Sequence, residues 1–466
     1  MPRRRRRLYD DGGVPQLPPE LIQRIALYVP ETANFFCYLE AFHKVPLLLG
    51  NLWYLWHLSQ EQPDLDDLWP ELHVHSLTSS NLASIQAMAH VFSVIHFHET
   101  FDVGLLQHCV SSTCAFTIRL TTTDADHILE PVEEWYAQLS RLPISELRWE
   151  RASDPDHRHI AALVSSMPSM PSLHCLDLRL PPSMIEPLLR YVATSSLVDL
   201  SLQAQALQTD SGVSLTPTDI QSLTHWLQSQ PVHNLYLEGW SAWHVPETIM
   251  AQFYTALWSN QSLWALGLHS VPLPHLDDFT FASPVHVHSL VLQGCDLGPA
   301  DMKALSQGLH LSSVTELDLT GNPLEYTGID ALASVLPHTK IETLKLMLTQ
   351  TGDRGCAALA VALPLSCVVD LDLSMNLISS VGATDLAHGL SQSATLSTLQ
   401  LQSNCISSTG AAMLVRTLGS RPVPTTLDLR NNTWDHDQAL REMVDQLPCT
   451  HVVALHTNSS TDCSLD

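Results

Sequence analysis

A short apolar pattern returns at a nearly constant interval from residue 314 onward, and this periodicity constrains the fold more than any other feature of the chain. Each unit has an apolar residue, two variable residues and then Leu-x-Leu. The first leucine of each pair stands at Leu317, Leu344, Leu371, Leu399 and Leu427. The successive intervals are 27, 27, 28 and 28 residues. A fixed period of roughly 20 to 50 residues is typical of proteins built from stacked repeats.

Each unit predicts one strand followed by one helix. Leucines at alternate positions indicate a strand with one buried face. The stretch that follows is rich in Leu and Ala, as at residues 328–336, where Leu332, Val335 and Leu336 form an apolar stripe. One unit cannot bury both apolar faces alone, whereas stacked units can. The pattern therefore predicts an α/β solenoid with parallel strands on a concave face and helices on a convex face.

Asparagine stands five residues after the first leucine in most units. These asparagines are Asn322, Asn376, Asn404 and Asn432. We expect their side chains to bond backbone groups left free where the strand turns, in one coil after another. Cys295 and Thr349 occupy the same slot in two other units, and Thr349 predicts a weaker coil. Together these residues resemble the leucine-rich repeat of the ribonuclease-inhibitor type, which implies a horseshoe-shaped solenoid.

The same register continues upstream with less regularity, and we place the solenoid at residues 68–457. Further strand centres are predicted at Leu72, Ile95, Ile118, Leu147, Leu176, Leu200, Leu235, Leu266 and Leu290, with Leu455 in a final capping coil. That makes about fifteen strands. A polar stretch at 203–217 is interpreted as a loop insertion. The residue after each centre is expected on the concave face, from His73, His96, Arg119, Arg148 and Asp177 at one end to Asp428 and His456 at the other.

Residues 15–60 predict a helical module instead. Pro18 and Pro19 suit the start of a helix that Pro30 stops. Thr32 is expected to cap a second helix, and a third is expected to begin near Asn51. The first helix carries an apolar stripe made of Leu21, Ile22, Ile25 and Val29.

The opening of this module resembles the F-box, which begins Leu-Pro-x-Glu-Leu/Ile-Leu/Ile-x-x-Ile. The matching residues are Leu17, Pro18, Glu20, Leu21, Ile22 and Ile25. The chain departs from that family at 43–46, where the family has Cys/Ser-Lys-x-Trp. The resemblance implies that Leu17, Pro18, Leu21, Ile22 and Ile25 dock the Skp-type adaptor of a cullin-RING ubiquitin ligase. The alternative is a helical cap that shields the first coil.

The charge distribution excludes several classes of function. The formal net charge is −26, and no Lys or Arg occurs between Tyr191 and Met302, so the body of the protein lacks the basic footprint that nucleic acids require. Arg3 to Arg7 lie in a tail, residues 1–14, that we expect to be disordered; it is either a solvated terminus or a nuclear-import or nucleic-acid signal. Residues 458–466 are a second tail. No membrane span or signal peptide is expected.

Ten scattered cysteines are typical of a reducing compartment, so we expect the cytosol or the nucleus. Ile95–His98 and Val285–His288 each place two histidines on one strand face, which we interpret as exposed strand residues, and no metal or cofactor is predicted. The sequence has no phosphate-binding glycine loop, no Gly-x-Ser-x-Gly and no His-Glu-x-x-His. We therefore expect a protein without enzymatic activity.

The concave face is the predicted partner-binding surface. Its candidate residues are Tyr236, Trp240, Trp243, Asp318, Lys345, Asp372 and Asp428. Exposed aromatic residues anchor many interfaces, and an acidic strip attracts basic partners. The alternatives are that the tryptophans pack under the enlarged loop and that the acidic residues serve solubility only. We assign Trp226, Trp258 and Trp264 to the core.

These features favour the substrate-recognition subunit of a ubiquitin ligase, which would raise the concentration of a target protein at the ligase. A repeat scaffold without a link to a ligase is the second hypothesis. A GTPase activator resembling the Ran GTPase-activating protein is the third, although no matching motif is found near the first repeats.

Overall fold

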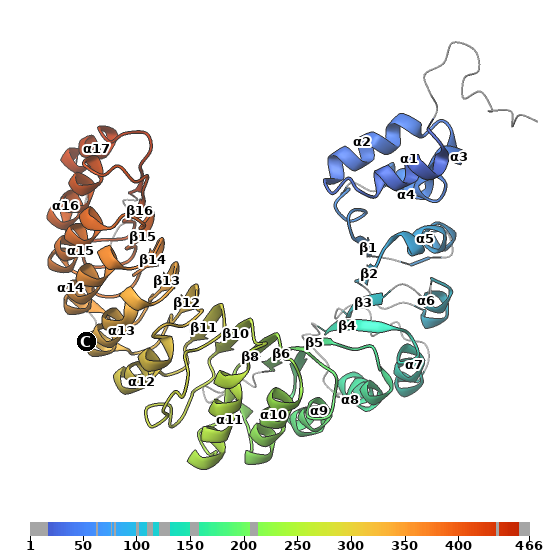
Figure 1. Ribbon diagram of the computed structural model, residues 1–466, viewed down its shortest axis with the longest axis horizontal. Coiled ribbons are helices and arrows are strands. Elements are labelled where there is room, and N and C mark those ends of the chain that lie inside the picture. The colour runs from blue at the N-terminus through green and yellow to red at the C-terminus, as the bar shows by residue number, and fades with distance from the viewer. Residues whose placement is uncertain are drawn as a thin grey trace, which may run out of the picture. The chain divides into compact units, whose positions relative to one another are not determined.

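The computed structural model describes residues 17–61, 64–75, 77–78, 81–98, 102–109, 115–120, 131–149, 158–205, 213–434 and 438–455. The predicted tails at 1–14 and 458–466 lie outside these ranges. The chain divides into two compact units, residues 1–178 and 179–466, and each is described in turn (Figure 1).

The first unit opens with four helices. They are α1 (Pro19–Ala26), α2 (Thr32–Phe42), α3 (Pro46–Leu49) and α4 (Leu52–Ser59). The three expected helices are present, and the short α3 is additional. Thr32 does not cap α2 as predicted. It is the first residue of that helix, and its hydroxyl donates a hydrogen bond to the carbonyl of Trp69 at 3.0 Å.

Trp69 joins this helical module to the repeats of the first unit. Its ring stacks on Phe35 with the ring centroids 4.0 Å apart, and its Nε1 donates to the carbonyl of Val29 at 2.8 Å. Both aromatic rings are buried. The module and the first coil therefore share one apolar core.

Strands and helices alternate through the rest of the first unit. They are β1 (Leu72–Val74), α5 (Leu82–Met88), β2 (Val94–Phe97), α6 (Val103–Cys109), β3 (Ala115–Leu120), α7 (Val132–Leu139), β4 (Ile144–Trp149), α8 (Arg158–Ser166) and β5 (Cys175–Leu180). The five strands are parallel and follow one another in chain order.

One register in this unit differs from the prediction. Ile95 pairs with Phe116, and Ile118 pairs with Phe97, so His96 lies opposite Thr117 rather than Arg119. Both strands carry apolar residues at two alternating positions. A shift of two residues keeps the same faces buried, so the period-two pattern does not distinguish the two registers.

The second unit continues the alternation. Its elements are α9 (Ile185–Val192), β6 (Asp199–Ala204), β7 (Val213–Ser214), α10 (Pro217–Ser229), β8 (Asn234–Glu238), β9 (Trp240–Ser241), α11 (Glu247–Ser259), β10 (Ala265–His269), β11 (Ser289–Gln293), α12 (Pro299–Leu309), β12 (Glu316–Asp318), α13 (Glu325–Val335), β13 (Thr343–Lys345), α14 (Gly352–Ala362), β14 (Asp370–Asp372), α15 (Ser380–Gln392), β15 (Thr398–Gln400), α16 (Ser408–Gly419), β16 (Thr426–Asp428), α17 (Gln438–Asp445) and β17 (Val452–Ala454).

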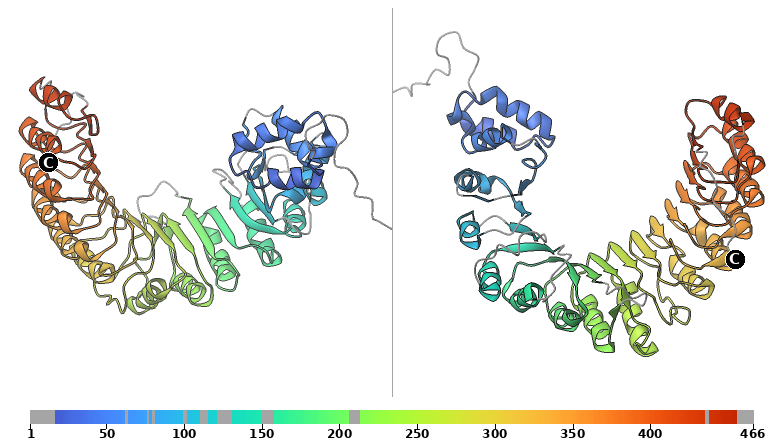
Figure 2. Two further views of the ribbon diagram at one scale, coloured as in Figure 1. Left: turned by 45° about the horizontal axis from the view of Figure 1, so that its top comes forward. Right: turned by 180° about the vertical axis from the view of Figure 1, so that it is seen from behind.

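Ten of these strands form a parallel sheet with the repeat leucines in register. Leu200, Leu235, Leu266, Leu290, Leu317, Leu344, Leu371, Leu399 and Leu427 form one row of paired residues. All of them are at most 2% exposed, as the predicted stacking requires. Within this unit the strands lie on the inner side of its curve and the helices on the outer side (Figure 2). The fold is the predicted α/β solenoid.

The row ends differently from the prediction. Leu427 pairs with Val453 and Asp428 pairs with Ala454, so the last strand is centred on Val453 and not on Leu455. His456 lies outside the described residues. Val452, Val453, Ala454 and Leu455 are all apolar, so residues 452–455 show no alternation of apolar and polar residues. The sequence pattern alone therefore permits more than one register.

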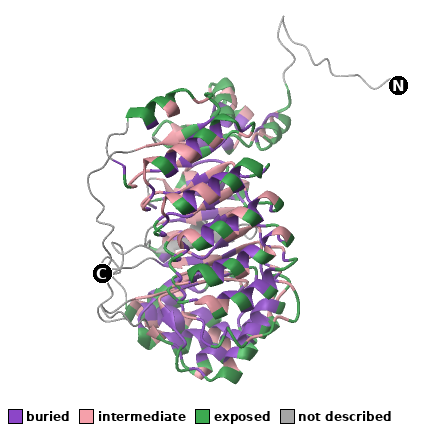
Figure 3. Cartoon of the chain, turned by 90° about the vertical axis from the view of Figure 1, so that its left-hand side faces the viewer, coloured by how far each residue is buried: buried purple, intermediate pink, exposed green. Residues whose placement is uncertain are grey.

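One coil of the second unit has no helix. Residues 270–288 connect β10 to β11 as turns, and two phenylalanines cover the apolar edge that a helix would otherwise cover. Phe279 lies 5.5 Å from Tyr254 and Phe281 lies 5.6 Å from Trp258, measured between ring centroids. Figure 3 shows buried and exposed residues along the same helix, as in amphipathic helices.

The asparagine ladder links consecutive coils. The Nδ2 of Asn404 donates to the carbonyls of Leu401 in its own coil and Leu373 in the preceding coil, at 3.1 and 3.0 Å. Its Oδ1 accepts from the backbone N–H groups of Asn376 and Ile378. Asn322, Asn376 and Asn432 bond in the same way. The hydroxyl of Thr349 donates to the carbonyl of Leu346 within its own coil. The coil of Thr349 therefore lacks the bond that an asparagine makes to the preceding coil.

Candidate protein-binding surfaces

The acidic strip predicted on the strands is largely paired within the chain. Lys345 lies between Asp318 and Asp372 in the strand register. Its Nζ is 3.6 Å from Asp318 and 3.4 Å from Glu316. Asp318 is only 2% exposed and also accepts a hydrogen bond from Gln293 at 2.7 Å. Asp318 is therefore a buried structural carboxylate and not the contact residue that was predicted.

Asp428 is also paired, because Arg430 of the same strand end holds both of its carboxylate oxygens at 2.9 Å through Nε. Asp372 and Asp370 have no ion pair among the described residues. They are the accessible negative charges of the strip. Burial and pairing thus reduce the predicted acidic surface to a smaller patch around β14.

The aromatic residues of the second unit divide differently from the prediction. Trp240 is 1% exposed, and its Nε1 donates to the carbonyl of Leu202 at 2.9 Å, so it is a core residue and not a binding anchor. Trp243 is 52% exposed. Trp264, which was assigned to the core, is 57% exposed and stacks on His288 with the centroids 3.8 Å apart. The alternating pattern could not decide this, because Trp240 begins the two-residue strand β9, and Trp243 and Trp264 lie outside the strands.

Tyr236 lies at its predicted position in the central row. Its hydroxyl donates to Glu238 at 3.0 Å, and its ring lies 4.8 Å from that of His269. The neighbouring residue in the register is Gly267, where an added Cβ would lie 2.7 Å from the ring of Tyr236. The glycine therefore makes room for the tyrosine ring across the strands.

Exposed apolar residues at the turns after β13 and β14 were missed by the sequence reasoning. Leu348, Met375 and Leu377 are 47%, 46% and 54% exposed. Leu348 and Met375 stand four residues after the repeat leucines Leu344 and Leu371, a position where a polar residue would be expected. They lie beside the acidic patch of β14. This edge combines apolar and negative groups.

The first helix of the N-terminal module exposes a second apolar surface. Leu17, Leu21 and Ile25 are 44%, 44% and 37% exposed, and Pro18 is also exposed. Their spacing of four residues places Leu21 and Ile25 on one side of α1. Ile22 is 2% exposed, so it belongs to the module's core and not to the predicted docking face.

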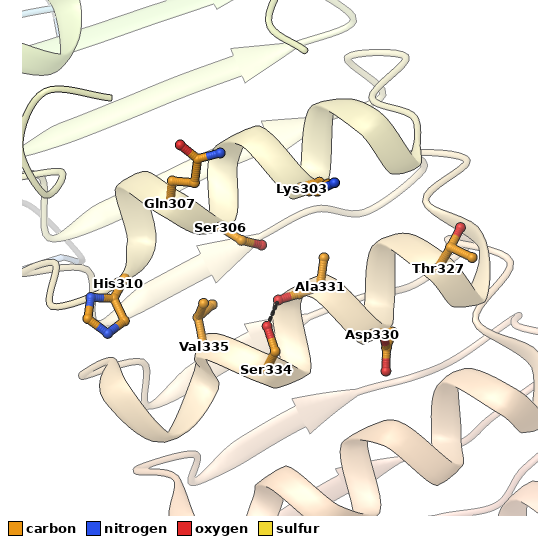
Figure 4. Close-up of a pocket in the computed structure, with 9 residues that line it drawn as sticks. All are labelled: Lys303, Ser306, Gln307, His310, Thr327, Asp330, Ala331, Ser334 and Val335. Carbon is orange, nitrogen blue, oxygen red and sulfur yellow. Dashed lines mark hydrogen bonds between the residues drawn. The ribbon is translucent and has the colours of Figure 1, made fainter. Parts of the chain in front are cut away.

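A groove with a volume of about 650 Å³ lies between α12 and α13 on the helical side (Figure 4). Its walls include Lys303, His310, Asp330 and Val335. The hydroxyl of Ser334 donates to the carbonyl of Ala331 at 2.7 Å. The lining groups do not combine an activated nucleophile with a base, so the groove has no catalytic arrangement.

Buried thiol and phenol groups are held neutral. Burial raises the pKa of the Cys295 thiol to about 12 and raises that of Cys356 still further. Burial also raises the pKa of Tyr254, whose hydroxyl donates to the carbonyl of Pro274 at 2.8 Å. These groups stabilise the core and cannot act as nucleophiles at neutral pH.

A histidine cluster on β1 and β2 was not predicted as a site. Glu71, His73 and His96 place three ligand atoms within 4.8 Å of one another. Burial, and then the neighbouring His96, lower the pKa of His73. The signal was present in the sequence, because x-His-x-His occurs on two strands that pair with each other. Val285–His288, the other such motif, was predicted to lie on a strand, but it precedes β11 in the connection at 270–288.

The comparisons with known proteins agree with the geometry of the repeats. A family model described as a leucine-rich repeat matches residues 310–333 and 392–415. The chain carries leucine-rich repeats. They coincide with the coils whose leucines and asparagines form the row and the ladder of the second unit.

Relatives share part of the leucine-rich repeats. The chain is 28% identical over 216 residues to the mouse protein "NACHT, LRR and PYD domains-containing protein 12", a match that covers 44% of the chain and 20% of the relative. It is 34% identical over 102 residues to the rat protein "NACHT, LRR and PYD domains-containing protein 1a allele 1", covering 21% and 8%. The chain therefore spans only a small part of the length of these relatives.

Among solved structures, the chain matches an internalin from Listeria monocytogenes. It is 12% identical, with a TM-score of 0.36, over 88% of this chain and 94% of the internalin. In the part of the chain that the structure describes, no helix combines the length and apolar character needed to cross a membrane.

Proposed function

We propose that this protein is the substrate-recognition subunit of a cullin-RING ubiquitin ligase. In this role the N-terminal module docks a Skp-type adaptor, and the strand side of the leucine-rich repeats holds the protein to be modified. The protein performs no chemistry itself, and it acts in the cytosol or the nucleus by bringing its target to the ligase.

The observation that carries the proposal is the exposed stripe on α1. Leu17, which precedes α1, and Leu21 and Ile25 on α1 match the opening of the F-box and remain substantially exposed, whereas Ile22 and Ala26 of the same helix are buried. Exposed apolar residues in register along a helix are typical of a helix that binds a partner. A helix that served only as a cap would carry polar residues on its outer side.

The repeats supply the second half of the proposed role. The apolar edge of Leu348, Met375 and Leu377 adjoins Asp370 and Asp372, which form no ion pair among the described residues. A target segment with basic and apolar side chains would complement both features. Trp243 and Trp264 offer further exposed aromatic surface.

The test is co-purification of the adaptor with the full chain from cells. The wild type should recover the adaptor, and the double variant L21D/I25D should lose it, since two charges would be placed in an apolar interface. The matched control is V361D/L365D, which puts the same charges at apolar positions that are 75% and 71% exposed on the repeats. Failure of the wild type to recover the adaptor would remove the proposal.

The second candidate is a repeat scaffold with no link to a ligase, which the similarity to the repeat regions of the mouse and rat proteins favours. In that case L21D/I25D would leave all partners of the chain unchanged. These point variants are better tools than deletion of residues 1–60, because deletion would expose Trp69 and disturb the first coil.

A further inference from the structure

Four histidines gather on and directly after the first two strands of the first unit. β1 and β2 pair so that His73 lies directly across from His96, and their rings stack with the centroids 4.4 Å apart. His75 and His98 follow two residues further along. The ring of His98 lies 5.0 Å from that of His73 and 4.5 Å from that of His75.

A carboxylate completes the cluster. Glu71 Oε2 lies 2.8 Å from Nε2 of His96 and 4.0 Å from Nε2 of His73. In a tetrahedral zinc site, bond lengths of about 2.0–2.2 Å place neighbouring ligand atoms roughly 3.3–3.6 Å apart. The three ligand atoms lie within 4.8 Å of one another, so small side-chain rotations bring them to that spacing.

The second nitrogen of His73 is already oriented. Its Nδ1 lies 2.8 Å from Nε2 of His98. When Nε2 of His73 binds a metal, Nδ1 carries the proton and donates a hydrogen bond to Nε2 of His98. Such an outer partner fixes both the tautomer and the ring orientation of a metal-binding histidine.

We propose that Glu71, His73 and His96 bind a zinc ion, with water completing its coordination. Two imidazoles and one carboxylate are a donor set suited to zinc, whereas calcium and magnesium prefer oxygen ligands alone. The side chains of His73 and His96 are 27% and 18% exposed and that of Glu71 is 60% exposed, so an ion has access.

The proposed ion would tie β1 to β2 and to the segment that precedes β1. That segment contains Trp69, through which the helical module packs on the first coil. Zinc would therefore stabilise the part of the first unit that connects the module to the repeats. This inference does not depend on the proposed ligase function.

The experiment is a zinc titration of the full chain, freed of metal with a chelator and monitored by competition with a chromophoric chelator. The wild type should bind one zinc ion per chain more tightly than it binds any further zinc ion. The variant E71Q should weaken that binding at least tenfold, and H73N/H96N should abolish it. The melting temperature of the wild type should rise by a few degrees with zinc, and that of H73N/H96N should not.

The matched control is H310N/H338N, which removes another neighbouring histidine pair, with ring centroids 5.2 Å apart. It should bind zinc as the wild type does. Circular dichroism checks that each variant is folded, and if H73N/H96N unfolds, E71Q carries the test because Glu71 is exposed. The proposal is overturned if the wild type binds no zinc ion tightly. It is also overturned if E71Q binds zinc as tightly as the wild type does.

Discussion

Single buried polar side chains hold consecutive coils of the second unit together. Asn404 satisfies two backbone donors and two carbonyls from two coils while being 2% exposed. Water cannot replace these bonds, because the site is buried. This explains why a polar residue recurs at a fixed position among leucines.

Replacing Asn404 with alanine should therefore destabilise the chain by about 3 kcal/mol, since several buried backbone groups lose their partner. Urea unfolding monitored by circular dichroism measures the effect. The exposed Gln392 at the end of α15 gives the control, and Gln392→Ala should change stability by less than about 0.5 kcal/mol. Equal effects of the two substitutions would contradict the structural role of the ladder.

Thiol reactivity is a second expectation at the residue scale. Cys295 is 1% exposed and its pKa is raised to about 12 by burial, whereas Cys37 is exposed. At pH 8 iodoacetamide should modify Cys37 at least about 100-fold faster than Cys295, because only the thiolate reacts. Mass spectrometry of the labelled peptides measures both rates. Rapid labelling of Cys295 in the folded protein would show that its coil opens.

Neighbouring helices of the second unit pack closely where glycine recurs. A Cβ added at Gly389 of α15 would lie 2.7 Å from the backbone of Ala360 in α14. Helix propensity alone would favour alanine over glycine by about 1 kcal/mol. Packing and propensity therefore make opposite predictions at this position.

We expect Gly389→Ala to destabilise the chain by about 1–3 kcal/mol, because α14 and α15 must separate to admit the methyl group. The control is Gly419→Ala in α16, where the added Cβ would meet only Leu447 at an ordinary 3.6 Å. Thermal unfolding of both variants measures the difference. A stabilised Gly389→Ala would show that propensity outweighs the helix contact.

The whole molecule carries a net charge of −26. Self-repulsion of this size destabilises a compact state. Dissolved salt shortens the range of the repulsion, from about 30 Å at 0.01 M to about 3 Å at 1 M. Ion pairs such as Lys345–Glu316 would be weakened by the same screening.

Repulsion should dominate, because the excess of negative charge far exceeds the number of surface ion pairs. Raising sodium chloride from about 20 mM to about 500 mM should therefore raise the melting temperature by a few degrees. Differential scanning fluorimetry measures the change. A melting temperature that falls with salt would mean that the ion pairs contribute more than the repulsion.

The repeat pattern was sufficient to predict the α/β solenoid, the buried leucine row and the positions of Asn322, Asn376, Asn404 and Asn432. These features depend on periodicity along the chain, which burial of one face imposes on every coil. Three features were decided only by the tertiary structure. They are the exposure of Trp240 and Trp264, the registers of β3 and β17, and the proximity of Glu71, His73 and His96. Each is decided by residues from different coils that lie side by side. Where the repeat is irregular, as at β3 and β17, an alternating pattern along one coil does not determine which residue of the next coil lies opposite.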